Sequence, residues 1–452
     1  MNDVNAPAVL LKPPDLVADR PSVNIGWLLF RALGLIYLTA FISFWSQAMG
    51  LIGANGIMPL VSSMHQLASE PTSNQLSTLL EYPTVFRWIG SSDLAIHGIC
   101  FLGTTLSGLL VMNVWPRRCI TTLWVLYLSL FTVSRPFLGY QWDILLLETS
   151  VLIFLFTPRA GDEPGTLQRT TTALSLWLLR LALFKVILSS GLVKLNSLDL
   201  TWQNLTALDL HFWTQPIPHQ FSWSIHHLGE QIRHLGVWFS HFVELAIPWL
   251  ILCSLSRQMT IIWLVAVSTI LMLYMGEYSI EMVLSIGGLT FVLWLIERML
   301  HTSIDEASWG RQLAGTAIAI LMVLIGSSGN YGFFNLLTLA LVLVCFTDKS
   351  LAWINTSRLQ SVLPKSAEPN HKGWFVTVLL CVVCLIPMNA IRVIELVGNH
   401  PSPTTDLNKP NGSTPIQGAI ELLKSFSNQY AKHLGALALV NSYGLFARMT
   451  TE

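Results

Sequence analysis

Several ionisable side chains lie within long apolar segments of the sequence. They are Arg31, Asp143, Glu148, Arg180, Lys185, Glu244, Glu277 and Glu281, with Lys194 at the end of one segment. A charge inside a bilayer is costly, so these residues are candidates for function. A desolvated lysine gives up its proton more readily and could act as a base. In the simpler interpretation, opposite charges pair between helices and fix their register.

The richest group of candidates is the stretch 190–218, where an apolar segment ends in polar and aromatic sequence. Its candidates are Lys194, Trp202, Thr206, His211, Gln215 and Pro216. Candidates from other segments are Trp142, Asp143, Glu148, Glu244, Asn330 and Tyr331. In a functional interpretation, Lys194, Trp142–Asp143 and the polar break SSGNYG would converge on an exterior cavity. In the plainer one, Lys194 only reaches the membrane–water boundary and tryptophans anchor it there.

The sequence gives little support for a metal site, a nucleotide site or thiol chemistry. His227, His234 and His241 recur every seven residues, but no cysteine or closely spaced histidine pair joins them, so no metal site is expected. Cys381 and Cys384 have the spacing of a redox motif but lie in mid-segment, which favours packing. The sequence contains no P-loop, dinucleotide-binding glycine pattern or nucleophile elbow. We therefore expect no cofactor.

Composition indicates a membrane protein. Charged residues make up 11% of the chain, hydrophobic residues 52%, and there are 17 tryptophans. Soluble domains carry roughly 25% charged residues. Lysine plus arginine and aspartate plus glutamate number 25 each, so no net charge favours nucleic acid as a partner. The expected environment is the lipid bilayer.

The apolar runs are continuous and predict an all-α, polytopic fold with about eleven transmembrane helices. They lie near 26–48, 93–113, 118–134, 142–157, 172–194, 236–256, 258–275, 280–298, 312–327, 332–347 and 374–394. With the N-terminus (1–25) in the cytoplasm, cytoplasmic connections carry 13 basic residues: Lys12, Arg20, Arg117, Arg118, Arg159, Arg169, Arg257, Arg298, Arg311, Lys349, Arg358, Lys365 and Lys372. The opposite connections carry Arg87, Arg135 and Arg233. This asymmetry supports a cytoplasmic N-terminus.

The predicted organisation is a membrane domain over 26–396, with exterior loops at 51–92 and 195–235, and an exterior tail over 397–452. The N-terminus lacks the features of a cleaved signal peptide. In the second loop Phe221, Ile225, Leu228, Ile232 and Leu235 recur at helical spacing. They predict one amphipathic helix with a buried apolar face, lying along the membrane surface or over the mouth of the bundle.

Five stretches, in order, resemble the lipase maturation factor family. They are GLIGANGIMP (50–59), QWDILLLET (141–149), SGLVKL with the residues that follow it (190–218), SGNYGFFNLLTLAL (328–341) and VNSYGLF-RMT (440–450). The resemblance implies a multi-span protein that helps secreted lipases to fold and assemble. It implies an exported client, such as a lipase, as partner. The location would be the endoplasmic reticulum membrane in a eukaryote or the inner membrane in a bacterium.

Two further points come from resemblance. In the family the NSYGLF stretch opens a strand-rich exterior domain, which we expect to be missing from this chain. SGLVKLN also resembles the segment of vitamin K-dependent gamma-carboxylase that holds its catalytic lysine, which Lys194 matches. The leading hypothesis is a non-enzymatic maturation factor. The alternatives are a membrane-embedded modification enzyme with Lys194 as base, and a transporter, which rests only on the buried charges.

Overall fold

The fold is described from a computed structural model, which describes residues 23–69, 80–156, 166–215, 217–253, 257–275, 308–347, 349–351, 371–398, 435–444 and 447–449. Helices dominate these ranges, and within them the only β-type pairing is an isolated bridge between Pro218 and Gly329. The predicted all-α fold is confirmed.

Six helical segments among the described residues are long and apolar enough to cross a membrane. They comprise α1 (Val23–Ile52), α5 (Asp93–Val111), α9 (Thr166–Asn196), α13 (Glu230–Leu245) with α14 (Trp249–Leu252), α17 (Trp309–Ser328) and α20 (His371–Gly398). Their length and composition confirm a multi-pass integral membrane protein, because each can satisfy its backbone hydrogen bonds internally.

Four other predicted segments coincide with helices that do not meet those limits of length and hydropathy. They are α6 (Pro116–Val133), α8 (Gln141–Leu155), α15 (Arg257–Met275) and α18 (Phe334–Val342), which a short 3₁₀ turn, η2 (Leu343–Cys345), extends. The predicted segment 280–298 lies outside the described residues. The figure of about eleven transmembrane helices therefore stays a prediction.

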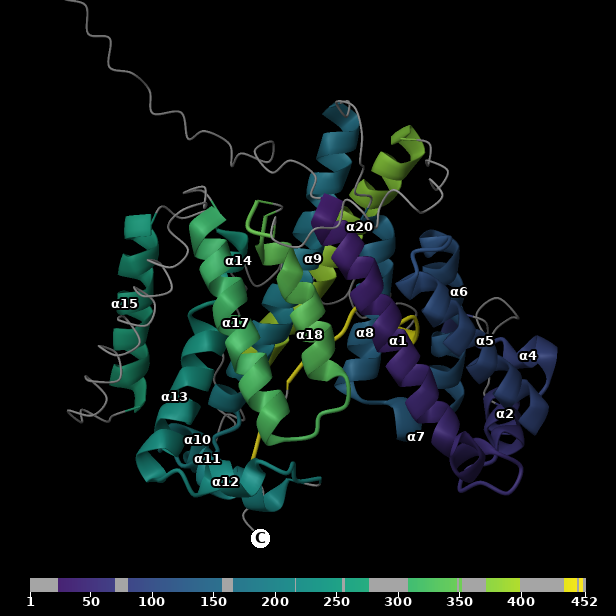
Figure 1. Ribbon diagram of the computed structural model, residues 1–452, viewed down its shortest axis with the longest axis horizontal. Helices are drawn as coiled ribbons and strands as arrows, with labels where there is room; N and C mark the ends of the chain where they lie inside the picture. Colours follow the sequence, from purple (N-terminus) through teal and green to yellow (C-terminus); the bar gives the residue numbers. More distant parts are fainter. Residues whose placement is uncertain are drawn as a thin grey trace, which may run out of the picture.

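Helix α9 lies at the centre of the bundle (Figure 1). It packs against α8, α13, α14, α18 and α20, while α1 packs against α5 and α18. One continuous core of buried apolar side chains joins these helices. The arrangement places α9, which carries Arg180, Lys185 and Lys194, among most of the elements that hold the other candidate residues.

Both predicted exterior loops lie at one end of the bundle. Figure 1 shows α2 (Leu60–Ser69) and α4 (Phe86–Ile89) at the same end as α10 (Leu200–Gln203), α11 (Ala207–Thr214) and α12 (Ser222–His226). The turn between α5 and α6 lies at the opposite end. The two loops therefore share one end of the molecule, and the side of the membrane that this end faces stays a prediction.

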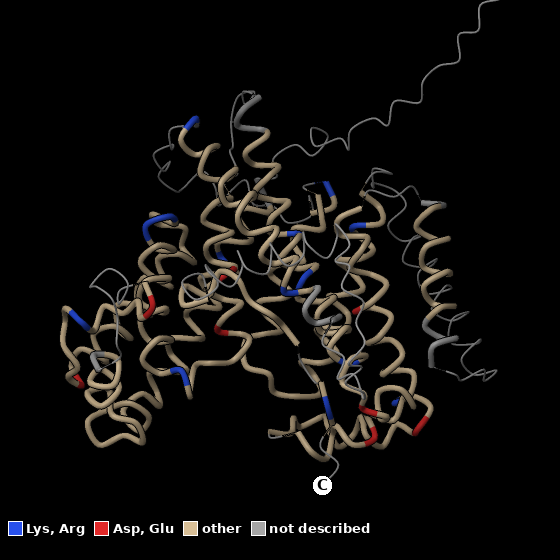
Figure 2. The backbone as a smooth tube through the Cα atoms, turned by 180° about the vertical axis from the view of Figure 1, so that it is seen from behind, with Lys and Arg blue, Asp and Glu red and all other residues tan. Residues whose placement is uncertain are grey.

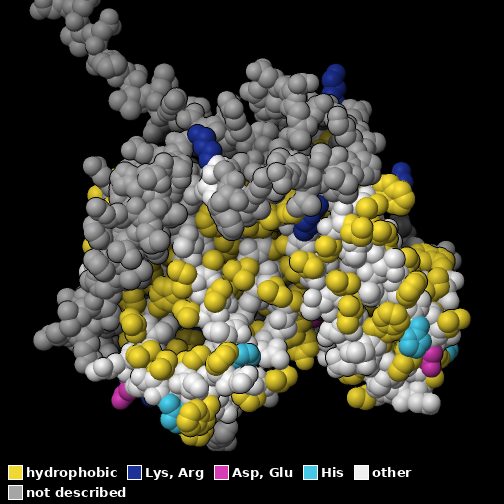
Figure 3. Space-filling view, viewed as in Figure 1, with side chains coloured by type: hydrophobic (Ala, Val, Ile, Leu, Met, Phe, Trp, Pro, Cys, Tyr) yellow, Lys and Arg dark blue, Asp and Glu magenta, His cyan; other side chains and the backbone are white. Residues whose placement is uncertain are grey.

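The surface is divided in the way that a bilayer requires. Figure 2 shows lysines and arginines at the upper rim and others near the lower end, where aspartates and glutamates also lie. Figure 3 shows apolar side chains across the middle of the visible face, with histidines and acidic residues near its lower edge. An apolar belt between two polar ends matches hydrocarbon between two aqueous phases.

The predicted single amphipathic helix over 221–235 is wrong. Helix α12 ends at His226 and α13 begins at Glu230, and Gly229 between them has a φ of 105°, which ordinary side chains rarely adopt. The guanidinium of Arg233 holds this corner by donating to Asp209 and to the carbonyl of His226.

The apolar face of this segment is not buried against the protein either. Phe221, Leu228 and Ile232 are 53%, 54% and 50% exposed. Phe221, Leu228 and Ile232 do not lie on one continuous helical face, because α12 ends before Gly229 and α13 begins after it. They are left for the surroundings of the protein to cover.

We predict that the end carrying α10–α12 is exterior. In a background where Cys253 and Cys384, both exposed, are replaced by serine, Gln220→Cys should react with an impermeant thiol reagent in intact cells or right-side-out vesicles. Met112→Cys, at the other end, should react only after permeabilisation. The reverse pattern would overturn the predicted orientation, and equal labelling of both would mean that they lie on one side.

Candidate functional site

Two buried ion pairs connect α9 to its neighbours. Lys185 Nζ lies 2.6 Å from Glu148 Oε1 on α8, and Lys194 Nζ lies 2.5 Å from Glu244 Oε1 on α13. All four side chains are at most 5% exposed. The structure therefore supports the interpretation in which opposite charges pair between helices. We call the two groups of residues the Glu148 centre and the Lys194 centre.

The Lys194 centre forms where α9 and α13 approach closely. A Cβ atom on Gly191 would lie 2.7 Å from Leu245 Cδ2 and 2.9 Å from Glu244 Cβ, so a larger residue would force the helices apart. Lys194 Nζ contacts both carboxylate oxygens of Glu244 at 2.5 Å and lies 4.9 Å from the centre of the Trp202 ring. Lys194 is thus held on one side by a carboxylate and on the other by the electron-rich face of an indole.

Two histidines flank this pair. His211 Nε2 lies 2.6 Å from the Tyr331 hydroxyl, and His241 Nε2 lies 3.4 Å from the carbonyl of Trp202. Burial, aided by the nearby charge of Lys194, lowers the pKa of His211 to about 4. His211 is therefore neutral at neutral pH and can exchange a hydrogen bond with Tyr331 without adding a second positive charge.

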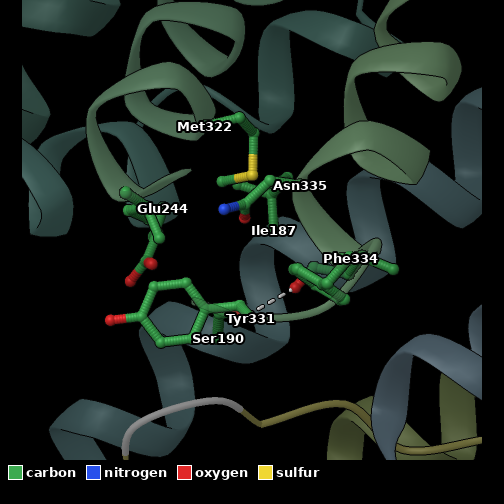
Figure 4. A pocket seen from close by; sticks show the side chains of 9 residues that line it. Ile187, Ser190, Glu244, Met322, Tyr331, Phe334 and Asn335 are labelled. Atoms are coloured by element: carbon green, nitrogen blue, oxygen red, sulfur yellow. Dashed lines mark hydrogen bonds between the residues drawn. The ribbon is translucent and has the colours of Figure 1, made fainter. Parts of the chain in front are cut away.

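A small cavity opens beside Glu244, lined also by Ser190, Tyr331 and Asn335 (Figure 4). Its volume of about 20 Å³ has room for one water molecule but not for an organic cofactor. The side-chain oxygen of Asn335 is buried and has no hydrogen-bond partner in the described part of the chain. A water here would satisfy that oxygen and hydrate the ion pair.

The Glu148 centre is the more extensively bonded of the two. Lys185 Nζ also donates to Asn389 Oδ1 on α20 at 2.6 Å. Glu148 Oε2 accepts from Asn441 Nδ2 at 2.9 Å and from the Tyr443 hydroxyl at 2.7 Å. Residues 441 and 443 belong to the C-terminal segment, so this segment lies in the helical domain and completes a buried network there.

The sequence candidates missed three members of this network, namely Asn389, Asn441 and Tyr443. Asn389 carried a usable signal, because an amide in the middle of an apolar segment needs a partner there. Asn441 and Tyr443 belong to the NSYGLF stretch, which the sequence identified only through resemblance. Neither residue is charged, so a search for ionisable side chains passes over them.

Trp142 and Asp143 join the Lys194 region only in part. The indole of Trp142 packs on Gly332, where a Cβ atom would lie 3.3 Å from Trp142 Cε2, and it stacks on Tyr140. Asp143 instead accepts hydrogen bonds from the Tyr127 hydroxyl at 2.5 Å and from its own helix N-terminus at Tyr140. The polar break SSGNYG therefore contacts Trp142 through Gly332 and contacts His211, beside the Lys194 centre, through Tyr331. The Asp143 carboxylate instead serves the contact between α6 and α8.

Two of the remaining candidates, Gln215 and Thr206, position the loop between α9 and α13. Gln215 Nε2 donates to Ser222 Oγ at 2.9 Å and to the Ser328 carbonyl at 3.2 Å, which ties the loop to the end of α17. Thr206 closes a local turn onto the carbonyl of Thr201, and Asn330 is exposed. Pro216, Glu277 and Glu281 lie outside the described residues.

Aromatic rings of this loop form an exposed surface, which we call the Trp–His face. It consists of three ring pairs, Trp213–His226, Trp223–His227 and Phe221–His219, with centroids 4.9, 4.1 and 5.4 Å apart. Trp213 and Trp223 are 72% and 71% exposed. Each histidine of this face packs against an aromatic ring, and the three do not converge on a common point. The face is therefore suited to contact with an apolar or amphipathic molecule.

Comparison with known proteins gives a family match. Residues 25–302 match the family model described as the lipase maturation factor transmembrane domain. The chain is 29% identical over 370 residues to lipase maturation factor 2 of Xenopus tropicalis, covering 80% of this chain and 43% of the relative. It is 28% identical over 312 residues to lipase maturation factor 1 of Mus musculus, covering 67% and 52%. No solved structure matches the chain.

We predict that Lys194 and Glu244 depend on each other for stability. Lys194→Met leaves Glu244 buried without its cation and should destabilise the protein by about 3–5 kcal/mol, whereas Lys194→Met with Glu244→Met should recover most of that loss. Unfolding of the purified protein in detergent, followed by tryptophan fluorescence, measures both. Glu230→Gln, at a residue whose side chain is 71% exposed, is the control and should have little effect. A double variant as unstable as Lys194→Met would contradict the coupling.

Proposed function

Because the chain belongs to the lipase maturation factor family, we propose that it is a membrane-embedded maturation factor that assists the folding or assembly of an exported client such as a lipase. The observation that carries this proposal is the match of residues 25–302 to the family's transmembrane domain. The chain spans about 43% of the length of lipase maturation factor 2 of Xenopus tropicalis. The endoplasmic reticulum membrane of a eukaryote, or the inner membrane of a bacterium, is the proposed location.

The Trp–His face is the surface best suited to a client. It lies at the end of the molecule that holds both predicted exterior loops. Hydrogen bonds from Gln215 and Ser222 to the carbonyl of Ser328 fix it to α17, so its rings are presented on a firm support. Exposed tryptophans offer a large apolar area at low entropic cost, which suits the exposed apolar surface of an incompletely folded client.

The enzymatic alternative rests on Lys194, which is buried beside His211 and His241. Both oxygens of Glu244 lie 2.5 Å from its Nζ, and this geometry suits an ammonium that donates to a carboxylate. A base needs a free lone pair on that nitrogen. The ion pair therefore favours the non-enzymatic proposal, and the adjoining cavity is too small to hold an organic substrate.

The proposal is tested by co-expressing the chain with secreted lipases in cells that lack their own maturation factor. We expect a higher specific activity of secreted lipase when the chain is present. Photo-crosslinking residues at Trp213 and Trp223 should capture the lipase, whereas one at Met112, 62% exposed at the opposite end, should not. An unchanged lipase activity over a panel of clients would contradict the proposal.

We predict that Lys194→Arg keeps most client-maturation activity, because arginine stays charged and can bond both oxygens of Glu244. Lys194→Met should lose more, because it leaves Glu244 without a cation. Lipase activity is measured at matched levels of membrane-inserted protein. Near-complete loss in Lys194→Arg at a normal protein level would contradict the prediction and support the enzyme, since arginine cannot serve as a base.

A further inference from the structure

The C-terminal segment 440–444 lies within the helical domain in an extended form. Along Asn441, Ser442 and Tyr443 the side chains alternate between buried and exposed, as in a strand, and Tyr443 is among the most deeply buried side chains. Figure 1 shows the yellow C-terminal trace running through the middle of the bundle toward its lower end.

The backbone of this segment is bound by one side chain of α8. Gln141 Nε2 donates to the Gly444 carbonyl at 2.8 Å, and Gly444 N donates to Gln141 Oε1 at 3.0 Å. The amide thus pairs with both backbone groups of one residue, as a neighbouring strand would. Such pairing holds an extended chain whatever its side chains are, provided that the residue is not proline.

The Glu148 centre determines which side chains fit at positions 441 and 443 of the segment. One oxygen of Glu148 accepts from Lys185, so its other oxygen is left for the donors of Asn441 and Tyr443. Lys185 Nζ also lies 4.9 Å from the centre of the Tyr443 ring. Asparagine and tyrosine two residues apart supply two donors to a buried charged acceptor, and hydrogen bonds to charged groups are stronger than neutral ones.

The position after tyrosine requires glycine. A Cβ atom on Gly444 would lie 2.5 Å from Val193 Cγ2 and 3.2 Å from Val193 Cβ on α9. A larger residue would therefore push the segment away from α9 and break its bonds to Gln141. Farther along, Met449 N donates to Asp199 Oδ2 at 2.7 Å, which fixes the segment a second time, next to α10.

We propose that α8 and α9 form a binding site for an extended peptide of the sequence Asn-x-Tyr-Gly, occupied by the chain's own residues 441–444. Gln141 binds the peptide backbone, Glu148 with Lys185 selects asparagine and tyrosine, and Val193 admits only glycine. The segment acts as an internal ligand of the helical domain. This site is separate from the Trp–His face and does not depend on the proposed function.

Occupancy of the site is coupled to the packing of α8 on α9. Withdrawal of the segment removes two donors from Glu148 and leaves one of its oxygens buried without a partner. An unsatisfied charged acceptor is costly in an apolar interior. The segment should therefore leave slowly even when it is no longer covalently attached to the helices.

The test cuts the full-length protein after it has folded. A protease recognition sequence with Gly-Ser spacers is inserted between Asn411 and Gly412, outside the site, and the purified protein is cleaved in detergent. The C-terminal fragment should remain bound to the helical domain. Ser442→Ala, at an exposed position of the same segment, should retain the fragment equally well.

Tyr443→Phe removes one hydrogen bond to the carboxylate and keeps the ring, and it should release the fragment about tenfold faster or more. Gly444→Ala should also accelerate release, through the clash with Val193. Should Gly444→Ala fail to accumulate, the comparison of Tyr443→Phe with Ser442→Ala still decides. Immediate loss of the wild-type fragment, or equal release rates for Tyr443→Phe and Ser442→Ala, would overturn the proposal.

Discussion

The structure depends on α9 being tied to its neighbours on two opposite faces. Lys185 and Lys194 are nine residues apart, which is two and a half turns of an α-helix, so they project in opposite directions. One lysine therefore reaches Glu148 on α8 and the other reaches Glu244 on α13. In an apolar interior each charge can be accommodated only with its partner, so the two pairs fix both the rotation and the height of α9.

The end of the molecule that carries α10–α12 takes its geometry from this constraint. Trp202 lies against Lys194, and His211 bonds Tyr331 beside Glu244, so the loop after α9 is built onto the Lys194 centre. The bonds of Gln215 and Ser222 to Ser328 then fasten the loop to α17. The connection between α9 and α13 is therefore a supported surface on which Trp213 and Trp223 are exposed.

The sequence predicts those features that depend on local composition. Apolar length located the helices, because a segment must span the hydrocarbon whatever surrounds it. The buried charges could be identified from the sequence because they interrupt these apolar segments. Which charge pairs with which could not be predicted, since that depends on which helices become neighbours. The prediction of one helix over 221–235 was wrong because the spacing of apolar residues does not show that Gly229 adopts a positive φ. Asn441 and Tyr443 have an evident role only once the C-terminal segment is seen beside Glu148.

Both ion pairs are completed by residues that lie outside the long apolar helices. Trp202 covers Lys194 from the loop, and Asn441 with Tyr443 satisfies Glu148 from the C-terminal segment. Helices that pack before these segments bind can therefore pair their charges. The remaining contacts of Lys194 and Glu148 form only when the loop and the C-terminal segment bind. The loop and the C-terminal segment then have a shared role, since each contributes contacts to one of the two ion pairs. We therefore expect a change in either segment to alter the packing of α9 against α8 or α13.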